Sequence, residues 1–191
     1  MKMSDFEKLF VNNTIRSRQV SHYAEKMLKL IGCQAGQRYL DFGCGNGASA
    51  INLAKKYPLD VTGIDIDADQ IRLAQASRCS IPNVRFLTVD GTRLPFDDAR
   101  FDIVYTNKVT HHISNWLEAV TEMVRVVKPG GHLIYSDLIA PIWLADIGQK
   151  VMKQTGFPTS DGLETLFNRH QLYKVHASIT PLHCEVVLQK S

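Results

Sequence analysis

Apolar residues recur along the middle of this chain with two alternating periods. Short, mostly apolar runs predict strands at 38–42, 60–65, 84–89, 101–106 and 132–137. Between them, apolar residues spaced three and four apart predict helices at 46–57, 68–77 and 116–127. Strands that alternate with helices pair in parallel, so the pattern predicts an α/β fold with a doubly wound sheet.

The two ends of the chain depart from this alternation. A capping-box pattern at Ser4–Glu7 predicts a short opening helix, and an apolar stripe from Val20 to Ile31, followed by Gly32, predicts a second. After the fifth strand we expect a helix within 141–155, a loop over 155–162, and strands at 171–178 and 182–188 that form an antiparallel hairpin. Seven strands are therefore expected.

Two details of the fourth and fifth strand region are also predicted. The Pro129-Gly130-Gly131 tripeptide is expected to form the turn between the 116–127 helix and the 132–137 strand. The inward face of that helix is expected to carry Leu117, Val120, Thr121, Val124 and Val127.

No shift in composition marks a linker, so we expect one domain over 1–191, with helices in 1–36 covering the site of a 37–191 core.

Composition narrows the class of protein. The chain is 45% hydrophobic and 21% charged, as globular proteins are, and its net charge of +3 is not gathered into the basic cluster that binds nucleic acid. No apolar stretch approaches the roughly 20 residues of a membrane span. The first five residues lack the pattern of a secretion signal, so a cytoplasmic location is expected.

A glycine-rich loop follows the first predicted strand. Asp41-Phe42-Gly43-Cys44-Gly45-Asn46-Gly47 stands where a strand ends and a helix begins, and glycines there let the backbone approach a ligand closely. With Asp65 at the next strand end, the loop also fits the dinucleotide pattern, so a nicotinamide or flavin remains open at this point. Asp90-Gly91, at the third strand end, offers an acceptor and a backbone N–H suited to an adenine edge.

An ordered series of motifs resembles the class I methyltransferases that depend on S-adenosylmethionine (AdoMet). The series is Asp41-x-Gly43-x-Gly45-x-Gly47, Gly63-Ile64-Asp65, Asp90-Gly91-x-x-Leu94-Pro95-Phe96, Phe101-Asp102-Ile103-Val104, His111-His112-Ile113 and Arg125-Val126-Val127-Lys128-Pro129-Gly130-Gly131. The resemblance covers 37–137. It implies a Rossmann-like seven-stranded sheet of order 3-2-1-4-5-7-6 with an antiparallel last strand.

The resemblance also implies where AdoMet, and its product S-adenosylhomocysteine, would bind. Asp41 and the backbone of Gly43, Cys44 and Gly45 would hold the methionine end. The other expected contacts are Asp65 with the ribose, Ile66, Asp90 and Gly91 with adenine, and Asn107 with the amino group.

The sequence indicates fewer candidate residues for the methyl acceptor than for the cofactor. His111 or His112 is a candidate base or substrate contact, while the alternative is that one caps a turn and the other faces solvent. Phe6, Phe10 and Tyr23 are candidates for a lid or for plain packing. Asp137 with His111 or His112 could suggest a metal site, as in catechol-type methyltransferases, but Asp137-Leu138 replaces the paired acid and amide of those enzymes, so no metal is expected.

The leading hypothesis is a methyltransferase acting on a small molecule by in-line displacement. Around 90–131 the sequence is also similar to the C-methyltransferases of quinone biosynthesis. Two alternatives stay open: a methyltransferase acting on RNA or protein, and a protein that binds AdoMet without turning it over.

Overall fold

The strands form the sheet that the sequence predicts. A computed structural model describes residues 14–78, 81–152 and 155–191, and its seven strands have the order β3-β2-β1-β4-β5-β7-β6. The strands are β1 Arg38–Phe42, β2 Asp60–Asp65, β3 Val84–Thr88, β4 Phe101–Asn107, β5 Val127–Leu138, β6 Leu172–Thr180 and β7 His183–Lys190. The predicted fold class and strand order are confirmed.

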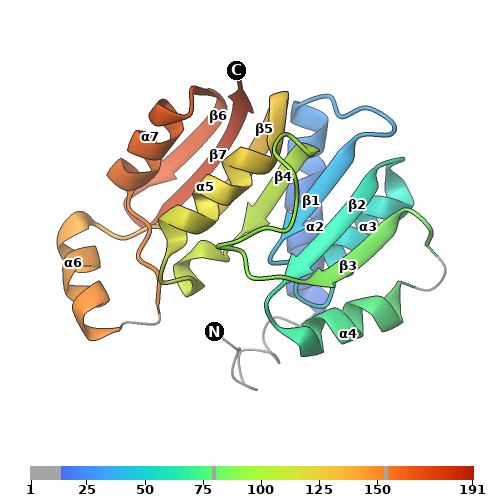
Figure 1. Cartoon of the computed structure of the whole chain (residues 1–191), viewed down its shortest axis with the longest axis horizontal. Helices are drawn as coiled ribbons and strands as arrows, with labels where there is room; N and C mark the ends of the chain where they lie inside the picture. Colours follow the sequence, from blue (N-terminus) through green and yellow to red (C-terminus); the bar gives the residue numbers. More distant parts are fainter. Residues whose placement is uncertain (1–13, 79–80, 153–154) are drawn as a thin grey trace. The chain divides into compact units, whose positions relative to one another are not determined.

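Contacts within the chain group it into two compact units, Met1–Gly91 and Thr92–Ser191. In the first unit, β1, β2 and β3 pair in parallel, with Asp41 opposite Gly63 and Gly63 opposite Phe86. Its helices are α2 Thr14–Leu30, α3 Ala48–Lys56 and α4 Ala68–Ser77, and α2 packs against α3 (Figure 1). The single domain expected over 1–191 stays a prediction.

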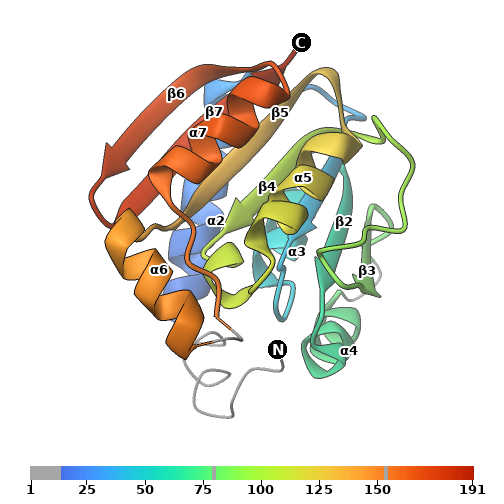
Figure 2. The same cartoon turned by 60° about the vertical axis from the view of Figure 1, so that its left-hand side comes forward.

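In the second unit, β4 and β5 are parallel, and β7 runs antiparallel to both β5 and β6. The 3₁₀-helix η1 Thr110–His112 follows β4, and the α-helices are α5 Trp116–Val126, α6 Ile142–Val151 and α7 Ser160–Arg169. Helices α5 and α7 lie side by side on one face of these strands (Figures 1 and 2). The C-terminal hairpin is therefore confirmed as antiparallel.

Three local predictions are wrong. The buried face of α5 carries Trp116, Ala119, Val120, Met123, Val124 and Val126. Leu117 is exposed, because Trp116 and Met123 set a stripe one position out of phase with the one predicted. Pro129-Gly130-Gly131 does not precede the fifth strand: β5 starts at Val127, and the tripeptide lies in an irregular stretch within it.

The third error is helix α7, which the sequence analysis did not predict. Its N-cap is Thr159, whose side chain accepts a hydrogen bond from the Gly162 backbone N–H. Gly156, Pro158 and Gly162 favoured a loop over 155–162, but the Gly162 backbone lies so close to the Trp116 ring that a Cβ there would be 2.8 Å from it. The glycine thus permits close packing of α7 on α5. The predicted opening helix, with Phe6 and Phe10, lies outside the described residues.

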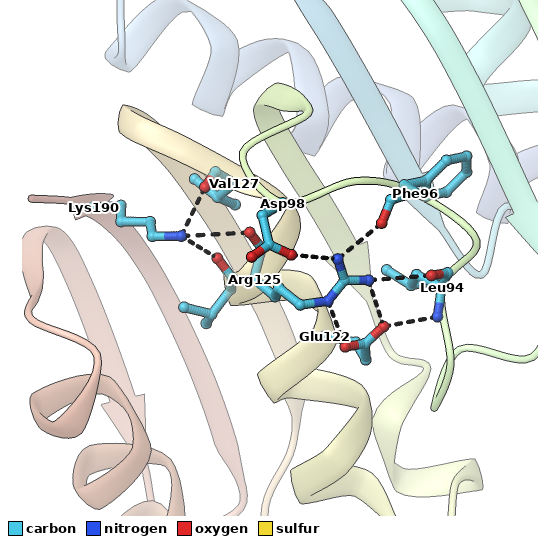
Figure 3. Close-up of polar contacts among 8 residues, drawn as sticks. Leu94, Phe96, Asp98, Glu122, Arg125, Val127 and Lys190 are labelled. Atoms are coloured by element: carbon cyan, nitrogen blue, oxygen red, sulfur yellow. Dashed lines mark hydrogen bonds and ion pairs between the residues drawn. The ribbon is translucent and has the colours of Figure 1, made fainter.

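The Arg125–Gly131 motif has a structural role in the second unit. The Arg125 guanidinium donates to both carboxylate oxygens of Glu122, to Asp98, and to the carbonyls of Phe96 and Leu94 (Figure 3). A planar fork with several donors is suited to this arrangement. Arg125 thereby fixes the segment 94–98 to α5.

Lys190, near the end of the chain, closes the same region. Its ammonium donates to the carbonyls of Val124 and Val127 at 2.8 Å (Figure 3). These carbonyls belong to the α5 end and the β5 start, where the helix leaves oxygens without partners.

Among the described residues, no helix is long and apolar enough to cross a membrane.

Candidate functional site

The loop after β1 is held open by glycines in the left-handed region. Gly43, Gly45 and Gly47 have φ of 78°, 53° and 74°. The Gly43 and Cys44 N–H groups both donate to the Ile64 carbonyl at 2.9 Å, which anchors the loop on β2. The loop joins β1 directly to the N-terminus of α3, a place where backbone N–H groups bind anionic ligand groups.

Asp65 ends β2 and supports this loop. One of its carboxylate oxygens accepts from the Gly45 N–H and the other from the Asp67 N–H, both at 2.9 Å. Burial raises the pKa of Asp65, and these two hydrogen bonds lower it in part. Because each carboxylate oxygen can accept a second hydrogen bond, Asp65 can still receive ribose hydroxyls.

Asp41, on β1, is buried with one carboxylate oxygen unpartnered. It is 3% exposed, and its Oδ2 has no hydrogen-bond partner among the described residues. Burial, and then the charge of Asp65, raise the pKa of Asp41 to about 7. A cation brought by a ligand would relieve this carboxylate, so the site fits the ammonium group at the methionine end of AdoMet.

The remaining cofactor candidates in the first unit also fit an adenosine group. Ile66 is 47% exposed directly after Asp65, and so leaves an apolar side chain for an adenine face. Asp90 is exposed just beyond β3, and a Cβ at Gly91 would lie 2.2 Å from the Phe42 ring. Burial raises the pKa of the Cys44 thiol well above its usual range, which opposes a nucleophilic role.

In the second unit, His111 is bonded to a buried carboxylate. Its Nδ1 lies 2.5 Å from Oδ1 of Asp137, which is fully buried at the end of β5. Burial alone would raise the pKa of Asp137, but the hydrogen bond and charge of His111 and the hydrogen bond from Thr110 outweigh burial and lower it. Because an ionised Asp137 accepts from Nδ1, Nε2 is the nitrogen that can take a proton in the tautomer with one ring proton.

Asp137 also builds the turn that carries His111. Its Oδ2 accepts from the backbone N–H groups of Val109 and Thr110 and from the Thr110 hydroxyl. Because that hydroxyl donates to Asp137, the fully buried Tyr135 hydroxyl is the donor in the 2.7 Å contact with Thr110. The turn and the imidazole are therefore positioned by one carboxylate.

The other two candidates of this unit, His112 and Asn107, lie close to His111 in the chain. The ring of His112 lies 4.0 Å from that of His111, centroid to centroid. Asn107 is the last residue of β4 and partly buried. Lys108 follows it at φ 56°, an uncommon conformation for a side chain of this size, and its N–H donates to the Ser136 carbonyl.

A family model described as a methyltransferase domain matches residues 40–135. The chain belongs to this methyltransferase family. The match confirms the resemblance inferred from the motifs, and AdoMet as the cofactor of the family. It removes the nicotinamide and flavin alternatives that the glycine loop alone left open.

The chain matches only part of the length of its curated relatives. The chain is 37% identical over 105 residues to a phthiotriol/phenolphthiotriol dimycocerosates methyltransferase of Mycobacterium leprae. The matched residues make up 54% of this chain and 38% of that protein. Over 133 residues the chain is 32% identical to a demethylmenaquinone methyltransferase of Staphylococcus aureus, 69% of this chain and 55% of the relative. The chain thus spans about half the length of these relatives, or less.

A solved structure has the same fold as this chain. The PH0226 protein of Pyrococcus horikoshii OT3 superposes with a TM-score of 0.77 over all of both chains, at 19% identity. At that identity the likeness speaks for the fold alone.

Sequence reasoning found most of these residues but missed how two of them combine. Asp137 was considered only as a metal ligand with a histidine, whereas the structure pairs it with His111. Within the described residues no three His, Cys, Asp or Glu side chains gather as a metal would need. The signal in the sequence was an acid at the end of one strand and a histidine after its parallel neighbour, since these ends share one sheet edge.

Proposed function

We propose that this chain transfers the methyl group of AdoMet to a hydroxyl group of a small-molecule acceptor, with His111 as the general base. The observation that carries the proposal is the 2.5 Å pairing of His111 Nδ1 with the buried Asp137. A base is needed only where the acceptor must lose a proton, so the pairing favours a hydroxyl over a tertiary amine or a thioether.

Methyl transfer requires the protein to position the reactants and accept a proton, without forming a covalent intermediate. Bound AdoMet would supply a methyl carbon on a positively charged sulfur, and the electron pair of the broken carbon–sulfur bond would stay on the sulfur of the neutral thioether. Nε2 of His111 would accept the hydroxyl proton as the acceptor oxygen bonds to that carbon. Asp137 holds the imidazole in the required tautomer and stabilises its protonated form.

On the cofactor side, the residues of the first unit have binding roles. We assign Asp41 and the backbone of Gly43, Cys44 and Gly45 to the methionine end. Asp65 is assigned to the ribose, and Ile66, Asp90 and Gly91 are assigned to adenine. Asn107 is assigned to the amino group, as the resemblance implies. The orphaned Oδ2 of Asp41 and the exposed Ile66 support this assignment.

The class of acceptor is supported by the relatives. Both curated relatives are named for small-molecule acceptors, one of them a triol. No basic cluster in the sequence favours nucleic acid, as the net charge of +3 is spread over the chain. We therefore place a small hydroxylated molecule before RNA or protein.

Binding is tested first. AdoMet and S-adenosylhomocysteine should each raise the melting temperature, because a ligand that binds the native state stabilises it. NAD is the control and should leave it unchanged. A shift with NAD and none with either AdoMet compound would contradict the cofactor assignment.

Turnover is tested by S-adenosylhomocysteine formation across phenols, aliphatic alcohols, amines and carboxylates. In His111→Gln, turnover with a reactive hydroxyl acceptor should fall about 10²- to 10⁴-fold while AdoMet affinity changes less than a few-fold. His112→Gln is the matched control, and an equal loss in both variants would refute the assignment to His111.

A further inference from the structure

We propose that the outward face of α6 binds the apolar part of the acceptor, which makes the substrate an amphiphilic molecule with a large apolar group beside its reactive hydroxyl. The proposal rests on the proposed function and names its substrate class. It concerns the described side chains of α6, Ile142–Val151, and its experiment has a readout that does not depend on turnover.

Helix α6 packs with its small residues and exposes its large ones. Ala145 is buried, and Gly148 lies so close to Phe157 that a Cβ would be 2.4 Å from the ring. Trp143, Ile147 and Val151 are 66%, 56% and 76% exposed. This is the reverse of the usual amphipathic helix, whose large apolar residues face the core.

The exposed residues form one face. Positions 143, 147 and 151 are four apart, so they follow one another along the same side of the helix. Ile142 and Leu144 flank this side and are exposed as well. A contiguous apolar surface of this kind marks a binding site more often than a solvated face.

Residues on either side of α6 lie next to the proposed base. The helix starts shortly after Asp137, and beyond its C-terminal end the Gly156 N–H donates to the His111 carbonyl at 3.0 Å. The Gly156 backbone lies so close to η1 that a Cβ would be 2.2 Å from the Ile113 carbonyl oxygen. Ala140 and Pro158 close the two ends with a 2.7 Å hydrogen bond.

Position in the fold separates α6 from the helices that cover the sheet. Both views show α5 and α7 lying on the strands, whereas α6 stands beyond the end of β5 (Figures 1 and 2). An apolar helix at that edge, tied on both sides to the His111–Asp137 pair, is placed to hold the body of a molecule whose hydroxyl reaches His111. We commit to this occupant over a membrane surface.

The test uses two phenols that differ in their apolar part, phenol and 4-nonylphenol. The variant W143S/I147S/V151S makes the α6 face polar, and Y173S/I179S does the same to similarly exposed residues of β6. The α6 variant should lower kcat/KM for 4-nonylphenol by about 100-fold and leave that for phenol within a few-fold, since only the longer acceptor buries apolar surface there. The β6 variant should match the wild type with both.

Binding is read separately from the fluorescence of Trp143 in the wild-type protein. 4-Nonylphenol should shift the emission to the blue and phenol should not, and Trp143→Phe should lose the shift, since Trp116 is buried. If neither phenol is methylated, the proposed function fails, but the blue shift still supports the apolar site. No shift in the wild type would overturn the inference.

Vesicles of phosphatidylcholine and phosphatidylglycerol test the other occupant. The inference expects no co-sedimentation of the wild-type protein with them. If the wild type binds the vesicles, the α6 variant does not, and 4-nonylphenol kinetics are equal in both, the face docks on a membrane and the inference is wrong.

Discussion

Replacing Asp41 by Asn should make the protein without cofactor more stable at pH 8. Asp41 is buried, its Oδ2 lacks a partner, and burial and the charge of Asp65 raise its pKa from 3.8 to about 7. The folded state therefore holds a proton on Asp41 that the unfolded state releases between about pH 4 and 7. The free energy of unfolding falls as pH rises through this window and stays low above it.

The size of the effect follows from the shift in pKa. At 1.36 kcal/mol per pH unit, a rise from 3.8 to about 7 removes about 4 kcal/mol at pH 8. Asn has nearly the same shape as the protonated acid and cannot ionise, so Asp41→Asn should be more stable than the wild type by about this amount. At pH 5.5 the difference should be about half as large.

Urea unfolding at pH 5.5 and pH 8, without AdoMet, measures this difference. Asp97→Asn is the control, because Asp97 is exposed, and its replacement should change the unfolding free energy by less than about 0.5 kcal/mol. With AdoMet the order should shift toward the wild type, whose ionised Asp41 can pair with the ligand ammonium. A variant that is no more stable than the wild type at pH 8 would refute the reasoning, as would an advantage that does not change with pH.

Three further substitutions test other parts of the fold. Asp65→Ala should weaken AdoMet binding by about 2 kcal/mol or more, measured by calorimetry, because the hydrogen bonds expected from ribose and the existing support of the Gly45 N–H are lost together; unchanged affinity would place the ribose elsewhere. Gly91→Ala should lower the unfolding free energy by about 1–3 kcal/mol, since its Cβ would meet the Phe42 ring; a stability equal to wild type in urea would contradict this packing. Arg125→Lys should cost about 1–3 kcal/mol in the same assay, since an ammonium cannot reproduce the forked contacts with Glu122, and a neutral result would show the network to be dispensable.

The alternation of strands and helices was predictable because each element carries its own period, whereas the order of the strands in the sheet came from the resemblance to the family. The strand at 60–65 is apolar enough to be buried on both faces, and the stripe of α2 places Ala24, Met27 and Leu28 in the core as expected. Helix α7 was missed because its first turn contains a glycine whose reason lies in the distant Trp116. A packing demand of that kind leaves no local pattern to find.

The cofactor residues were predictable from motif and spacing, but the condition of their side chains was not. That Asp41 has an orphaned oxygen while Asp65 is bonded to Gly45 depends on how β1 and β2 pair. The partner of His111 was within reach, since Asp137 had been noted at the end of its strand. What hid the pairing was the intervening turn, which Asp137 itself organises through Thr110.

The two buried aspartates of the sheet, Asp41 and Asp137, differ in how many hydrogen bonds their carboxylates accept. Asp41 and Asp137 are equally inaccessible to water, yet the pKa of the first is raised and that of the second lowered. The difference lies in their donors: Asp137 accepts from its own turn and from His111, whereas Oδ2 of Asp41 accepts from nothing in the described residues. A carboxylate buried without donors costs stability unless a ligand brings the charge. Asp41 is therefore suited to bind the cationic group of a ligand, whereas Asp137 positions His111.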